Sequence, residues 1–151
     1  MDNSVDKKKV AITDETRIVM GFDEVEVSGE PIKVNEFTFP QELKALTIAA
    51  PIIGEIADLY LNGGDPDMLE IEGVFATHGK ALTELLSIST GKPVEWFDTL
   101  PGKYASSLFL TFWGMNSHFF TQRIASRYIM ANPELLKTKK EKLDSANSAQ
   151  H

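Results

Sequence analysis

The sequence contains no cysteine and only three histidines, His78, His118 and His151, among its 151 residues. The lack of cysteine excludes a disulfide scaffold, thiol catalysis and thiolate metal sites. The histidines are too far apart to form the i, i+4 pair of a zinc-binding helix. We therefore expect no metal site and no cofactor.

Positive charge is also scarce, and the formal net charge is −7. This balance argues against nucleic-acid binding, because contacts with phosphate groups require clustered lysine and arginine. The basic clusters at residues 7–9 and 137–142 lie in polar termini with acids close by. We interpret them as solvated tails.

Motifs that position catalytic groups are missing as well. The Gly63-Gly64 pair is followed by Asp65 and Pro66 instead of the Lys and Ser/Thr of a phosphate-binding loop. No nucleophile-elbow pattern positions a serine, and the acids that follow Gly64 lack the order of a calcium loop. The sequence thus predicts a protein that is not an enzyme and has no catalytic residue.

The apolar residues lie between two polar ends. Residues 1–15 and 134–151 offer little surface to bury, which predicts a disordered N-terminal tail and a flexible C-terminal tail. Residues 16–133 are enough for one globular domain. The polar start, MDNSVDKKKV, lacks the apolar core of a targeting signal, so we expect a soluble intracellular protein.

The spacing of apolar residues changes along the domain. Alternation predicts a β-hairpin over residues 24–39, with a further strand before it. Helical spacing then runs from Pro40 to Asn62, and Pro51 is expected to kink this helix or divide it near Ala50. Further helices are expected before the long aromatic one. The predicted fold is mainly α (α+β), with an N-terminal β-hairpin followed by a four- to five-helix bundle.

The segment from Tyr104 to Tyr128 holds four of the nine phenylalanines and predicts one long helix at the centre of the bundle. Its buried amide, Asn116, is expected to bond to backbone near Trp96 or Asp98. Arg123 and Arg127 lie on the same side, where one of them either pairs with Asp98 or Glu95 or stays solvated. The predicted core residues are Trp96, Leu108, Phe112, Trp113, Asn116, Phe119 and Phe120.

Residues 104–122 carry no formal charge and are about as long as a membrane span requires. Six polar side chains, including Asn116 and His118, would then have to be accommodated at membrane depth. No second span and no basic flank accompany the segment. We therefore expect no membrane association.

Three segments occur in an order that resembles the tail assembly chaperones of long-tailed bacteriophages. They are FTFPQELKAL (Phe37 to Leu46), TGKPVEWF (Thr90 to Phe97) and NSHFFTQRI (Asn116 to Ile124), and the similarity spans roughly residues 24–131. The resemblance implies a non-enzymatic protein of the host cytoplasm. Its implied partners are the tape measure protein, which such chaperones coat, and tail-tube subunits, which they help to recruit. Self-association is left open.

Masking a long apolar partner requires an exposed apolar surface. The best candidates lie on both sides of the Gly63-Gly64 turn, where a proline-kinked helix can open. For each of them, ordinary core packing is the alternative. The candidate partner-binding residues are Ile52, Ile56, Leu59, Tyr60, Met68 and Leu69.

Two other classes of function compete with the chaperone. One is a small phage regulatory or host-interaction binding protein. The other is a small helical ligand-binding protein or enzyme, with its pocket under Trp96 and Trp113. An enzyme should bring titratable groups together in its pocket, whereas a chaperone should present an apolar surface.

Overall fold

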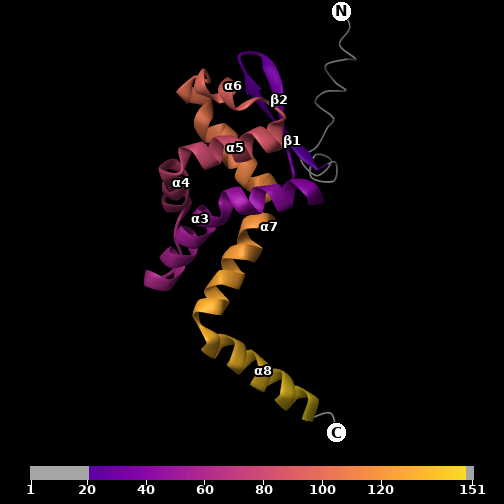
Figure 1. Cartoon of the computed structure of the whole chain (residues 1–151), viewed down its shortest axis with the longest axis vertical. Helices are drawn as coiled ribbons and strands as arrows, with labels where there is room; N and C mark the ends of the chain where they lie inside the picture. Colours follow the sequence, from indigo (N-terminus) through magenta and orange to yellow (C-terminus); the bar gives the residue numbers. More distant parts are fainter. Residues whose placement is uncertain (1–20, 149–151) are drawn as a thin grey trace, which may run out of the picture.

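The computed structural model describes residues 21–148, a two-stranded hairpin followed by a series of helices (Figure 1). This confirms the predicted mainly helical fold with an N-terminal hairpin. The predicted tail over residues 1–15 lies outside the described residues, as do residues 16–20 of the proposed extra strand. The elements are β1 (Phe22–Val27), β2 (Glu30–Asn35), α3 (Phe39–Gly63), α4 (Met68–Thr77), α5 (Gly79–Thr90), α6 (Val94–Asp98), the 3-10 turn η1 (Gly102–Tyr104), α7 (Ala105–Ala131) and α8 (Pro133–Ser148).

Strands β1 and β2 pair antiparallel, with Val25 opposite Ile32. The turn between them is short because Ser28 and Gly29 both adopt positive φ angles, 52° and 82°, which suit a two-residue hairpin turn. The Tyr104 hydroxyl accepts a hydrogen bond from the Ser28 N–H at 3.0 Å and so ties this turn to the start of α7. The hydrogen bonds with Ser28 lower the pKa of Tyr104.

Helix α3 begins with a capping box. The Thr38 hydroxyl accepts the Gln41 N–H at 3.4 Å, and the Gln41 side chain accepts the Thr38 N–H at 3.0 Å. The helix continues through Pro51 to Gly63, so of the two expected alternatives, a kink or a division near Ala50, the division is wrong. In Figure 1 the helix changes direction part way along, as expected where a proline removes one backbone hydrogen bond.

Among the described helices, α3 is long and apolar enough to cross a membrane, judged by length and composition alone. In the sequence, residues 104–122 were the segment considered as a possible membrane span. A core helix of a soluble protein meets the same criterion, and residues of α3 such as Ala45, Ala49 and Ile53 are buried within the fold. The apolar window of α3 is 39% buried, so the helix packs one face into the core and leaves another face exposed.

The centre of the fold is an aromatic cluster around Phe75 of α4, which is completely buried. Its ring lies edge-on to Phe109 and Phe120 of α7, with centroids 5.1 and 5.3 Å away. Most of the predicted core residues are buried with it, namely Leu108, Phe112, Asn116, Phe119 and Phe120. Trp96 and Trp113 are only partly buried, so their assignment to the core interior needs correction.

Asn116 is a buried, satisfied amide as predicted, but its partners are different. Its side-chain oxygen accepts the Phe37 N–H at 2.9 Å, and its nitrogen donates to the carbonyls of Asn35 at 3.2 Å and Phe112 at 3.4 Å. The expected partners near Trp96 and Asp98 are wrong because the end of the hairpin, not α6, packs on this side of α7.

The arginines of α7 also face α3. Arg123 pairs with Glu42 at 3.4 Å, and its guanidinium lies 4.1 Å from the centre of the Phe119 ring. The Arg127 guanidinium lies beside Gly54 of α3. Pairing of Arg123 with Asp98 or Glu95 is therefore wrong, because α3 crosses α7 where the sequence pattern suggested α6.

Most of the segment expected as a polar flexible tail, residues 134–151, is helical as far as Ser148, and residues 149–151 lie outside the described residues. Helix α8 spans Pro133–Ser148, and Figure 1 shows it projecting away from the rest of the protein. Proline suits the first turn of a helix, Glu134 is favoured there by the helix dipole, and the lysines and leucines that follow are good helix formers. The polar composition concealed this propensity.

We expect Asn116→Ala to lower the free energy of unfolding by about 1–3 kcal/mol, because the buried Phe37 N–H loses its acceptor. Urea denaturation measures this difference. The control is Gln122→Ala, an exposed position on the same helix, which should stay within about 0.5 kcal/mol of wild type. Equal stability of the two variants would contradict the role given to Asn116.

Phe75→Ala should cost about 3–5 kcal/mol, since it empties the middle of the aromatic cluster. Trp113→Ala should cost less, because part of its ring already contacts water. Denaturation midpoints of the two variants test this order. A larger loss for Trp113→Ala would show that the cluster is centred on α7 alone.

Candidate functional site

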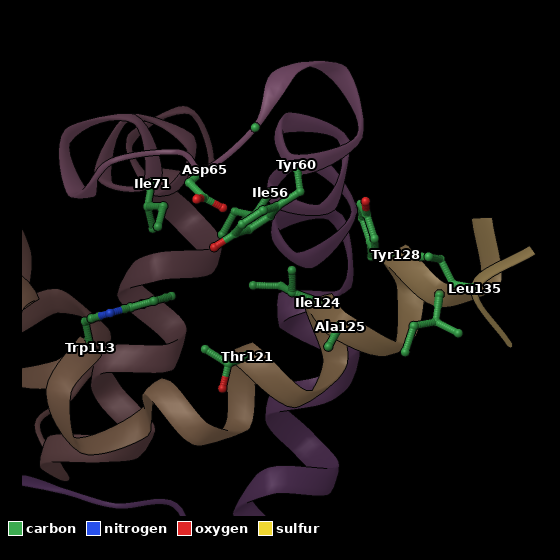
Figure 2. Close-up of a pocket in the computed structure, with 12 residues that line it drawn as sticks. Ile56, Tyr60, Asp65, Ile71, Trp113, Thr121, Ile124, Ala125, Tyr128 and Leu135 are labelled. Carbon is green, nitrogen blue, oxygen red and sulfur yellow. The ribbon is translucent and has the colours of Figure 1, made fainter. Parts of the chain in front are cut away.

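An apolar groove lies where the second half of α3, the start of α4, the second half of α7 and the first turn of α8 meet (Figure 2). Its volume is about 500 Å³. We call it the C-terminal groove. It is lined by Ile56, Tyr60, Gly64, Asp65, Ile71, Trp113, Thr121, Ile124, Ala125, Tyr128, Ile129 and Leu135.

Small residues of α7 leave space along one side of the groove. The sequence predicts a small, hydroxylated side of this helix opposite its aromatic stripes, and Thr121 and Ala125 of that side line the groove. Figure 2 shows Thr121, Ile124 and Ala125 on the side facing Tyr60 and Asp65. The short side chains leave space that larger ones would fill.

The opposite wall is fixed by the turn between α3 and α4. Gly64 ends α3 with a φ of 118°, a value that side chains other than glycine rarely adopt. Asp67 then caps α4, accepting the Glu70 N–H at 2.8 Å. These two features turn the chain sharply and place Asp65 at one side of the groove (Figure 2).

The groove offers little polar chemistry. Asp65 is its one charged lining residue, and the remaining polar groups are the hydroxyls of Tyr60, Thr121 and Tyr128 and the indole N–H of Trp113. Among the described residues, no group of three or more histidine, aspartate or glutamate side chains is placed to hold a metal ion. The lining suits the burial of apolar side chains, with one carboxylate to orient a cation.

The structure separates the predicted partner-binding residues. Ile56 and Tyr60 line the groove, but Ile52 and Ile56 are completely buried, so they do not form an exposed patch. Leu59 is partly buried and does not line the groove. Because α3 stays helical through Pro51, Ile52, Ile53, Ile56 and Ala57 remain packed in the core.

Met68 and Leu69 are exposed on α4, by 37% and 77%, but they lie outside the groove lining. The groove residues that the sequence argument missed come mainly from the end of α7 and the start of α8. The apolar residues Tyr128, Ile129 and Leu135 flank the Asn132-Pro133 break. This pattern was the sequence feature that could have indicated the groove.

In the part of the chain that the structure describes, Trp96 does not line the groove that contains Trp113, so a common pocket under the two side chains has no support. Trp113 lines the C-terminal groove, stacked on Phe120 with ring centroids 5.5 Å apart. Trp96 packs against Phe97 of α6, and the ammonium group of Lys92 lies 5.5 Å from the centre of its ring. The two tryptophans therefore belong to different surroundings.

A second apolar surface lies on the first half of α3. Phe39, Leu43 and Leu46 are 74%, 56% and 40% exposed. Their i, i+4, i+7 spacing places them on one face of the helix. We call this surface the α3 stripe. It falls within the FTFPQELKAL segment, whose apolar residues the sequence alone would have assigned to the core.

No curated protein and no solved structure matches this chain. One family model does match, over nearly the whole sequence, but it carries no assigned function. The resemblance to tail assembly chaperones therefore stays a prediction. Residues 16–151 match DUF6631, a family of unknown function, and the chain belongs to that family.

Proposed function

We propose that this protein is a phage tail assembly chaperone that binds an apolar helical segment of the tape measure protein in its C-terminal groove. The proposal includes no catalysis. The observation that carries it is the groove itself, an open apolar space of about 500 Å³ with a single charged lining residue. The identity of the partner comes from the resemblance of three sequence segments, in their order, to tail assembly chaperones.

The shape of the groove favours a helix as its occupant. Along α7 its lining extends from Trp113 to Ile129, which corresponds to about 24 Å of helix. A partner helix of roughly four turns fits beside this length. Its side chains at i, i+3, i+4 and i+7 would pack on the partly exposed lining residues Tyr60, Tyr128 and Ile129.

The charge of the site indicates which apolar helices bind best. Asp65 stands at one side of the groove, and the whole chain carries a net charge of −7. A partner with a lysine or arginine beside its apolar stripe gains an ion pair and faster association. An acidic partner is disfavoured by the same charges.

The resemblance also implies a second partner, the tail-tube subunit, and we assign it to the α3 stripe. Phe39, Leu43 and Leu46 lie near the start of α3, whereas the groove residues Ile56 and Tyr60 lie near its end. The two surfaces are thus separated along the helix. Simultaneous binding of both partners is then sterically feasible.

A helical ligand-binding protein is the second candidate, because the groove volume lies within the range of about 300–1,000 Å³ that small-molecule sites occupy. Binding of apolar dyes or fatty acids with defined stoichiometry would favour this class. A regulatory or host-interaction protein would instead bind a host protein and leave the tape measure protein insoluble.

The test is co-expression with the tape measure protein of the same phage, with Ala125→Arg as the blocking variant. Ala125 is exposed and lines the groove, so a long charged side chain fills the site without disturbing the core. Ile56→Asp is unsuitable because Ile56 is completely buried. The matched control is Ala131→Arg, an exposed alanine of α7 outside the groove lining.

Wild type and Ala131→Arg should keep the tape measure protein soluble and co-purify with it. Ala125→Arg should reduce the co-purified amount at least about tenfold, a change equivalent to about 1.4 kcal/mol. Circular dichroism and thermal melting must show that both variants fold. If wild type leaves the tape measure protein insoluble, the chaperone function is wrong. If both variants bind equally, the groove is not the site.

A further inference from the structure

We propose that the outer edge of β1 binds an extended, basic segment of a partner protein, which pairs with β1 as a further strand of the sheet. The inference goes beyond the proposed function, because it involves neither the C-terminal groove nor the tape measure protein. It rests on the direction of the backbone groups of the hairpin, on the difference between its edges and on the charge of β1.

The turn of the hairpin determines which backbone groups of β1 point away from β2. A two-residue turn makes its flanking residues, Val27 and Glu30, a hydrogen-bonded pair, and such pairs recur at every second residue of an antiparallel ladder. The hydrogen bond from the Glu36 N–H to the Gly21 carbonyl, at 2.8 Å, fits this alternation. The residues of β1 whose N–H and C=O groups point outward are therefore Phe22, Glu24 and Glu26.

The outer edge of β2 is closed to another strand. Pro31 has no N–H to donate, and the outward carbonyl of Asn35 already accepts hydrogen bonds from the side chains of Ser89 and Asn116, at 2.7 and 3.2 Å. Helix α5 also packs against β2. Among the described elements, β1 makes its main contacts with β2 and α7 instead. The edge that can accept a strand is therefore that of β1.

The outward groups of β1 can pair with an added strand. Within residues 21–148, the Glu24 N–H donates to the Asp23 carboxylate at 2.7 Å, a local bond that leaves the Glu24 carbonyl available. Glu26 is exposed, and both its N–H and its carbonyl point outward. An edge with such groups is a template for an extended peptide, whose own N–H and C=O groups complete the ladder.

The side chains of β1 specify the chemistry of the added strand. Glu24 and Glu26 lie on the outer face of the hairpin, because the intervening Val25 is buried on the core side. A lysine or arginine at every second position of the added strand would lie beside these carboxylates. The positions between them would lie beside Val25 and Val27, which favours apolar residues. The edge therefore fits a segment in which basic and apolar residues alternate.

The same charges disfavour a second copy of this chain as the occupant. Two β1 strands that pair antiparallel over their whole length would place Glu24 opposite Glu24 of the other copy. Like charges directly opposite each other are destabilising. The net charge of −7 adds repulsion between copies, whereas it attracts a basic segment.

Fluorescence anisotropy with labelled peptides tests binding to the full-length protein. The probe is a peptide of about eight residues in which lysine and valine alternate. The control peptide has the same residues in two blocks, which keeps the charge but removes the alternation. The protein should bind the alternating peptide at least about tenfold more tightly than the block peptide. Equal affinities would show that charge alone attracts the peptide, and would overturn the proposal.

A charge reversal on β1 tests the position of the site. The double variant Glu24→Lys, Glu26→Lys should bind the alternating peptide at least about tenfold more weakly than wild type. The matched control is Glu141→Lys, Asp144→Lys, which changes the net charge equally on α8, at the other end of the fold (Figure 1). At physiological salt it should bind within a factor of about three of wild type. Thermal melting must show that both variants fold. Equal losses in both variants would contradict a site on β1.

Amide hydrogen exchange gives a measurement on the wild-type protein that is specific to strand pairing. In the free protein the outward N–H of Glu26 should exchange rapidly, whereas those of Val25 and Val27, which face β2, should be protected. Saturation with the alternating peptide should slow exchange at Glu26 at least about tenfold. Unchanged exchange at Glu26 in the complex would contradict strand pairing. Protection of Glu26 in the free protein would show that another segment of this chain or a second copy already occupies the edge, which also overturns the proposal.

Discussion

The amide of Asn116 fixes how the hairpin joins the helices. It accepts the N–H of Phe37 and donates to the carbonyl of Asn35, which also accepts the Ser89 hydroxyl of α5 at 2.7 Å. The end of β2, helix α5 and helix α7 therefore meet at one buried polar junction. Buried polar groups without hydrogen-bond partners are costly, so the hairpin and helices have few other arrangements at this junction. The junction therefore sets where α3 begins.

The groove follows from that starting point. Once α3 begins beside Asn116, it crosses α7 near Arg123 and continues past Pro51. Large aromatic side chains fill the space near Phe75, but Thr121 and Ala125 do not fill the space farther along α7. The same helix thus packs its large aromatic residues, as far as Phe120, into the core, and its small residues Thr121 and Ala125 leave an open wall. Its division between aromatic and small residues is the structural cause of the site.

The sequence predicted the helices and strands more accurately than the contacts between them. Alternation around Val25 and the aromatic periodicity of α7 indicated the hairpin and the central helix, because burial imposes those periods locally. The partners of Asn116 and Arg123 were missed, since they depend on which element crosses α7. Of the groove residues, the sequence identified Ile56 and Tyr60, but it placed them in an exposed patch. The burial of Ile56 could not be predicted, because it depends on how α3 passes Pro51. Helix α8 was missed because its polarity concealed a good helix propensity.

The protein combines exposed apolar surfaces with a high net negative charge. Self-repulsion at a net charge of −7 favours solubility, yet Phe39, Leu43 and Leu143 are more than half exposed. Exposed apolar area lowers solubility, and filling the groove at Ala125 with a larger apolar residue would bury more surface at little steric expense. Stability alone therefore does not account for the open groove and the exposed leucines. Under the proposed chaperone function, each exposed surface becomes an interface whose burial contributes to binding.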